Sequence, residues 1–107
     1  MTSRPLALRA LLLLGVGLLS SSAIGAEGED GARLAWKYHC ISCHGPNGIS
    51  NSYRYPNLAG QNVAYLVGRL RYFRERLEPG NQMNAQAAPL SDEEIDKLAE
   101  YFNRPYL

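Results

Sequence analysis

The chain has 107 residues, which limits it to one small folded domain. Its 11 Lys and Arg side chains are balanced by 10 Asp and Glu, and the formal net charge is +1. This balance excludes a strongly basic nucleic-acid-binding protein and a polyacidic tail.

The first 26 residues resemble a secretory signal peptide. Arg4 and Arg9 precede an apolar run at residues 10–19, and small residues follow as far as Ala26. This run is too short to serve comfortably as an uncleaved membrane anchor, but it suits the core of a cleaved signal. We therefore expect residues 1–26 to be removed on export to the periplasm, no stable membrane insertion afterwards, and a single domain over residues 27–107.

Two helical segments are predicted in the first part of that domain. The first runs from Asp30, as its N-cap, into the sequence CISCH at residues 40–44. The second runs from about Asn62 to Leu77. Helical spacing gives the first segment one broad face, formed by Ala32, Ala35, Trp36, Cys40 and Cys43. It gives the second a narrow apolar stripe, formed by Leu66, Leu70, Phe73 and Leu77.

A third helix has the strongest start signal in the chain. Ser91 and Glu94 have the spacing of a capping box, and Leu90 can pack onto Ile95 as a hydrophobic staple. Pro105 ends the helix. No alternating pattern typical of strands appears anywhere, so the predicted fold class is all-α.

Long irregular segments separate the three predicted helices. They cover residues 45–61 and 78–89, and both are rich in Gly, Pro and Asn. Loops of this length are unusual in so small a domain unless they have a function. They are reasonable if they enclose a large bound group.

The sequence CISCH contains the only two cysteines, three positions apart, with a histidine directly after them. A disulfide or thioredoxin-like redox pair is compatible with export, but that motif belongs beside a strand, and none is predicted. A zinc site would need more ligands than His44 and His39 can add. The remaining chemistry for C-x-x-C-H is covalent haem attachment, which we favour.

The spacing of the motif explains this preference. Cysteines three apart on a helical turn lie on nearly the same face, so both sulfurs can reach the vinyl groups along one porphyrin edge. His44 then lies beneath the iron as the proximal ligand. We predict one covalently attached haem c, which would also supplement the small core available to a domain of this size.

The sixth iron ligand decides the class of function. Two protein ligands favour electron transfer, whereas an open site can bind or activate small molecules. Met83 is the only methionine after residue 26. Filling a gap in the core is the usual role of a lone methionine, but the polar neighbours of Met83 and the lack of helical periodicity around it favour iron ligation. His39 is the competing ligand, but it directly precedes Cys40 on the attachment side of the porphyrin.

Four sequence elements, in this order, resemble the class I c-type cytochromes, in particular the small bacterial type that also forms the halves of di-haem cytochromes. They are CISCHG, YPNLAGQ, the helix AYLVGRLRYFR and a methionine just before LSDEEIDKLAEYF. The resemblance covers residues 27–107. It implies a small class I cytochrome c fold, with three main helices and long loops wrapped around the haem.

The resemblance also implies roles for individual residues. The carbonyl of Pro56 would accept a hydrogen bond from the second ring nitrogen of His44 and so fix its tautomer, and Leu58 would pack on the porphyrin. Cys40 and Cys43 would carry the thioether bonds, while His44 and Met83 would ligate the iron. The predicted haem-contacting residues are Cys40, Cys43, His44, Pro56, Leu58 and Met83.

A further implication concerns the packing of the first helix on the last. Trp36 and Tyr101 would meet where these helices cross. Ala32 stands where the family frequently has glycine, so we expect a slightly wider crossing than in other members.

The expected function is that of a periplasmic mono-haem electron carrier, not itself an enzyme, that exchanges single electrons with redox protein partners. Two alternatives remain open. One is a haem enzyme or ligand sensor with a labile sixth site, and the other is an electron-accepting subunit of a dehydrogenase.

Overall fold

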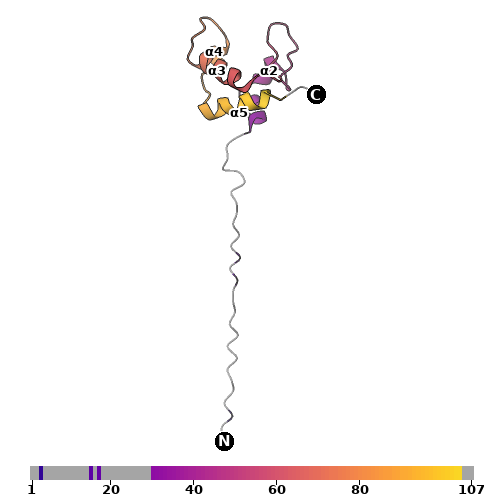
Figure 1. The fold of residues 1–107 in the computed structure, drawn as a ribbon, viewed down its shortest axis with the longest axis vertical. Coiled ribbons are helices and arrows are strands. Elements are labelled where there is room, and N and C mark those ends of the chain that lie inside the picture. Colours follow the sequence, from indigo (N-terminus) through magenta and orange to yellow (C-terminus); the bar gives the residue numbers. More distant parts are fainter. Residues whose placement is uncertain (1–2, 4–14, 16, 18–29, 105–107) are drawn as a thin grey trace.

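The structure is a computed structural model that describes residues 3, 15, 17 and 30–104. The expected signal peptide, at residues 1–26, lies outside these residues except at three isolated positions, so it stays a prediction. Within residues 30–104 the chain forms helices and no strands, which confirms the predicted all-α class. The helices are α1 (Gly31–Lys37), α2 (Cys40–His44), α3 (Val63–Arg74), α4 (Met83–Ala87) and α5 (Asp92–Phe102) (Figure 1).

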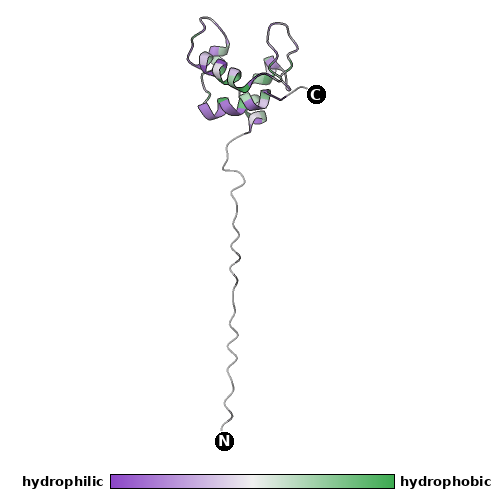
Figure 2. Cartoon of the chain, in the orientation of Figure 1, coloured by the Kyte–Doolittle hydropathy of each residue, from purple (hydrophilic) through white to green (hydrophobic). Residues whose placement is uncertain are grey.

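Helix α5 lies at the centre of the packing. It contacts α1 and α3, and α3 also contacts α4. Figure 2 shows hydrophobic residues where the helices meet and hydrophilic residues in the first turn of α5. Among the described residues, the buried core consists of Leu34, Ala35, Leu66, Ala87, Leu90, Ile95, Leu98, Ala99 and Phe102. None of the described helices has the length and apolar composition needed to cross a bilayer.

The first predicted helix begins where expected but is not continuous. Asp30 caps α1 by accepting a hydrogen bond from the backbone N–H of Arg33 at 2.9 Å. The chain then turns at Tyr38 and His39, and His39 has a left-handed backbone with φ of 60°. The expectation of one helix through CISCH is therefore wrong, because this residue redirects the chain between α1 and α2.

The crossing of α1 and α5 is close at Gly31. A Cβ atom on Gly31 would lie 2.5 Å from the Tyr101 Cβ and 2.6 Å from the Lys97 carbonyl oxygen. Trp36 is 70% exposed, and the Tyr101 hydroxyl donates to the Pro46 carbonyl at 2.7 Å. The glycine that permits close approach is thus Gly31, whereas the Trp36–Tyr101 contact and the wider crossing at Ala32 stay predictions.

Helix α3 starts at its predicted cap and ends earlier than predicted. The side chain of Asn62 accepts from the backbone N–H of Tyr65 at 3.1 Å. After Arg74 the chain leaves the helix, and Arg76 has a left-handed φ of 59°. Leu77, which the apolar stripe included, is consequently 53% exposed.

The capping box of α5 is confirmed. The Ser91 hydroxyl accepts from the Glu94 backbone N–H at 3.1 Å, and the Glu94 carboxylate accepts from the Ser91 backbone N–H at 3.0 Å. The preceding segment, expected to be irregular over residues 78–89, contains the short helix α4. Met83 is its first residue, which places this side chain on an ordered turn that packs against α3.

Candidate functional site

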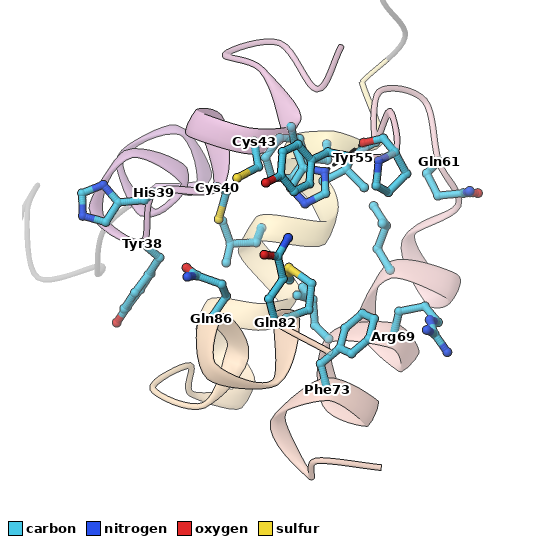
Figure 3. Close-up of a pocket in the computed structure, with 18 of the residues that line it drawn as sticks. Tyr38, His39, Cys40, Cys43, Tyr55, Gln61, Arg69, Phe73, Gln82 and Gln86 are labelled. Carbon is cyan, nitrogen blue, oxygen red and sulfur yellow. Dashed lines mark hydrogen bonds between the residues drawn. The ribbon is translucent and has the colours of Figure 1, made fainter. Parts of the chain in front are cut away.

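A cavity of about 740 Å³ lies among α2, α3, α4 and α5 (Figure 3). This volume is within the range of small-molecule and cofactor sites. Much of its wall is apolar and comes from residues far apart in the sequence. These wall residues are Leu58, Leu66, Leu70, Phe73, Leu90, Leu98 and Phe102.

The two cysteines share one edge of this cavity. Cys40 and Cys43 are both free thiols, one helical turn apart on α2, and Figure 3 shows them side by side. The His39 ring points away from the cavity in the same view, which agrees with its exposure. His39 thus borders the cavity, but its ring does not face inward.

Burial raises the pKa of the Cys40 thiol from 9.0 to about 11, because the desolvated site disfavours a thiolate. Thiol–disulfide exchange and zinc binding both require thiolates. A thioether sulfur is uncharged, so burial does not penalise it in this way. The burial of Cys40 thus disfavours a reactive thiolate or a zinc-bound thiolate, and it is compatible with a thioether.

His44 is oriented by a hydrogen bond to the 45–61 segment. Its Nδ1 lies 2.8 Å from the Pro56 carbonyl oxygen, and its side chain is 7% exposed. A carbonyl oxygen can only accept, so Nδ1 carries the proton and Nε2 keeps its lone pair. Tyr55 supports the ring edge-on, with 6.4 Å between ring centroids. His44 is therefore prepared to donate Nε2 to a metal centre, as metal-binding histidines commonly are.

Backbone hydrogen bonds fold the segment after α2 back, so that Pro56 lies next to this helix. The Gly48 carbonyl accepts from the backbone N–H groups of Leu58 at 2.7 Å and Ala59 at 3.0 Å. Gly45 ends α2 with φ of 80°, where a Cβ atom would collide with the Ile49 carbonyl. The sequence after His44 thus folds back on itself, and this loop brings Pro56 to the histidine ring.

Met83 lines the cavity from α4 and is partly buried. Its backbone N–H donates to the Asn81 side chain at 2.8 Å, which fixes the start of the short helix. His44 and Met83 come from different helices but line the same space. All six predicted contact residues surround this one cavity, while their bonds to a haem remain predictions.

Several polar side chains at the cavity did not figure in the sequence-based site, among them Tyr38, Gln86 and Arg69. Tyr38 lines it beside His39 and donates its hydroxyl to the Glu94 carboxylate at 2.7 Å. Gln86 lines it from α4, one turn beyond Met83. Arg69 lines the cavity from α3. Helical spacing could have indicated this position, because Arg69 lies one turn from Leu66 and next to Leu70.

The residues present fit a c-type haem. The cavity combines two thiols at one edge, an oriented imidazole nitrogen, a thioether sulfur and apolar walls. Imidazole and thioether are the axial ligand pair of His/Met haem proteins. Over the described ranges, no three His, Cys, Asp or Glu side chains are grouped as ligands for a bare metal ion. The donor set therefore matches a porphyrin-bound iron better than a zinc ion.

Comparison with known proteins agrees with this fit. The family model described as cytochrome c matches residues 28–104. The thiosulfate dehydrogenase electron acceptor of Stutzerimonas stutzeri (strain A1501) is 35% identical over 89 residues, which cover 78% of this chain and 41% of the relative. Cytochrome c4 of Thiocapsa roseopersicina is 43% identical over 63 residues, covering 59% of this chain and 32% of the relative. The chain spans less than half the length of these two relatives.

A solved structure shares the fold. The crystal structure of reduced recombinant cytochrome c4 from Pseudomonas stutzeri is 36% identical, with a TM-score of 0.58, and the match covers 63% of this chain and 38% of that one. The predicted class I cytochrome c resemblance is confirmed. The chain belongs to the cytochrome c family, and it carries the motif for a c-type haem at residues 40–44.

Proposed function

We propose that this protein is a periplasmic electron carrier with a single haem c, attached through Cys40 and Cys43 and ligated by His44 and Met83. The observation that carries the proposal is the cavity, which collects these four side chains from two helices distant in sequence. Export follows from the predicted signal peptide at residues 1–26. The partners would be redox proteins, and the chain itself would not catalyse a reaction.

When bound, the haem supplies a one-electron Fe(III)/Fe(II) couple. Cys40 and Cys43 would retain it, and His44 would ligate the iron in the orientation that Pro56 imposes. Met83 would be the second protein ligand to the iron and would keep water and small ligands away. Neutral ligands and apolar walls disfavour extra positive charge, so they favour the reduced state. Two protein ligands on a fixed scaffold also limit rearrangement between the two states.

Substitution of Met83 tests the proposal directly. In Met83→Ala, imidazole should bind the ferric protein rapidly, the far-red charge-transfer band of methionine ligation should disappear, and the reduction potential should fall. The haem should stay covalently bound. Gln86→Ala is the matched control, because Gln86 lines the same cavity from the same helix but has no proposed ligand role. It should bind imidazole as slowly as the unmutated protein.

One outcome would favour the alternative with an open or labile site. If the unmutated protein and Met83→Ala bind imidazole equally fast at unchanged potential, Met83 does not ligate the iron. Attachment has a separate test in Cys40→Ala/Cys43→Ala, which should release haem on acidic acetone extraction. Free extraction of haem from the unmutated protein would contradict attachment through the cysteines.

A second candidate function is electron acceptance from a dehydrogenase of the thiosulfate type. Two relatives carry the name thiosulfate dehydrogenase electron acceptor, from Stutzerimonas stutzeri at 35% identity and from Thiomonas intermedia at 39% identity. In anaerobic stopped-flow, such a dehydrogenase with thiosulfate should reduce the ferric protein within its turnover time. The control omits thiosulfate. Reduction no faster than in this control would leave only the general carrier function.

A further inference from the structure

We propose that Arg69, Glu78 and Asn84 form a latch that holds Met83 in the haem cavity and sets how readily an added ligand replaces it. These residues are positioning residues rather than ligands. The proposal rests on the proposed function, since it requires Met83 to ligate iron. The contacts run from α3 through the connecting turn to α4.

The first part of the latch is an ordered arginine. The Arg69 guanidinium lies 4.7 Å from the ring centroid of Tyr72 and 4.6 Å from that of Phe73. It also donates to the Glu78 carboxylate at 3.1 Å. These cation–π contacts restrict the guanidinium before the ion pair forms, so less side-chain entropy is lost than in an ordinary surface pair. Figure 3 shows Arg69 beside Phe73 at the cavity.

The turn after α3 presents Glu78 to this arginine. The Tyr72 hydroxyl donates to the Leu77 carbonyl at 3.0 Å, and the Leu77 N–H donates to the Tyr72 carbonyl at 3.1 Å. The left-handed Arg76 turns the chain back toward α3. Glu78 is therefore held both by its carboxylate and by the turn that precedes it.

Asn84 connects Glu78 to the proposed ligand. Its side-chain Nδ2 donates to the Glu78 carbonyl at 2.6 Å, and it directly follows Met83 in α4. The side chain is 7% exposed, and its Oδ1 has no partner in the described part of the chain. Because Oδ1 makes no hydrogen bond in the described part of the chain, the Nδ2 bond is the polar contact that holds this amide in place. Moving Met83 away from the cavity would displace its neighbour and strain this bond.

The other end of the segment has a separate attachment. Arg74 donates to the Leu90 carbonyl at 3.0 Å and to the Asp92 carboxylate at 2.6 Å. Both ends of the Met83 segment are thus fastened to α3. The latch is the fastening nearer to Met83, so its loss should affect ligand replacement before it affects the fold.

Stopped-flow binding of imidazole to the ferric holoprotein tests the latch. Arg69→Gln and Glu78→Gln should each speed binding about two- to fivefold, the effect expected for loss of a partly exposed ion pair. Asn84→Ala should speed it about five- to a hundredfold, because it removes a buried hydrogen bond. Arg71→Gln is the control. Arg71 lies on the same helix and is exposed, and its ion pair with Asp92 is long, with 4.0 Å between Nε and Oδ1.

The double variant Arg69→Gln/Glu78→Gln distinguishes a latch from general loosening of the fold. If the two side chains act together, it should bind imidazole no faster than either single variant. Arg69→Lys should fall between the unmutated protein and Arg69→Gln, because it keeps the charge and loses the planar stacking. Thermal unfolding of Arg69→Gln should match that of Arg71→Gln.

The results separate this proposal from the one on which it rests. If Met83→Ala does not speed imidazole binding, the ligand assignment fails, and the latch fails with it. If Met83→Ala does speed binding but all three latch variants behave like Arg71→Gln, the ligand assignment stands and the latch is refuted. Additive effects in the double variant would also overturn it.

Discussion

Substituting Gly31 with alanine should destabilise the protein, although glycine-to-alanine changes in helices usually stabilise. Alanine in a compatible helical site gains about 0.4–1 kcal/mol. At Gly31, however, the new Cβ would lie 2.5 Å from the Tyr101 Cβ and 2.6 Å from the Lys97 carbonyl oxygen. Neither neighbour is the end of a flexible side chain, so α1 must move away from α5. Such overpacking costs about 1–3 kcal/mol.

Gly68 is the matched control for this prediction. It lies inside α3, and a Cβ atom there would meet nothing within 4 Å. Gly68→Ala should therefore stabilise the protein by about 0.5–1 kcal/mol. In a domain of this size each kcal/mol corresponds to a shift of about 4–8 °C in Tm, which thermal unfolding of the holoprotein resolves. Equal shifts for the two variants, or a higher Tm for Gly31→Ala, would refute the close crossing of α1 and α5.

Three further predictions concern the caps and the cofactor. Ser91→Ala should lower the free energy of unfolding by about 1 kcal/mol, because it removes the N-cap of α5, and an unchanged denaturant midpoint would contradict this. The Arg74 side chain lowers the pKa of Asp92, and the Ser91 backbone N–H lowers that of Glu94. Both carboxylates therefore stabilise the fold when the pH is above their ordinary pKa values of 3.8 and 4.5. This stabilisation should be lost as the pH falls through the lowered pKa values of the two carboxylates. Asp92→Asn should therefore reduce the decrease of Tm at acidic pH, which thermal unfolding over a series of pH values measures. Cys40→Ala/Cys43→Ala without haem should lack a cooperative transition by circular dichroism, and a sharp one would show that the side-chain core suffices.

The starts of α1, α3 and α5 could be predicted from the sequence, whereas the ends of the first two predicted helices could not. Asp30, Asn62 and Ser91 each accept a hydrogen bond from a backbone N–H three positions later, which is a local interaction that a short sequence window contains. The ends near His39 and Arg76 depend on left-handed backbones at residues that are not glycine. No local pattern signals these conformations, since their cost of about 1–3 kcal/mol is offset by packing elsewhere.

The candidate site likewise combines a local sequence pattern with contacts between residues far apart in the sequence. The spacing of CISCH identified its chemistry because the two cysteines and the histidine lie within one helical turn. The bond between His44 and Pro56 spans 12 positions and depends on a loop that closes through Gly48, so only the family resemblance indicated it. The contact between Arg69 and Glu78 depends on where the turn after α3 places Glu78, which no local sequence pattern indicates.

The packing of α3 explains why the apolar stripe of Leu66, Leu70 and Phe73 predicted the position of this helix. Leu66 is buried in the core with α5, whereas Leu70 and Phe73 are partly buried and line the cavity. These two side chains pack against the core cluster on one side and face the cofactor site on the other. A helix used in this way needs apolar residues toward two different surfaces. The side-chain core and the haem cavity therefore share α3, and changes at Leu70 or Phe73 should affect cofactor environment and fold stability together.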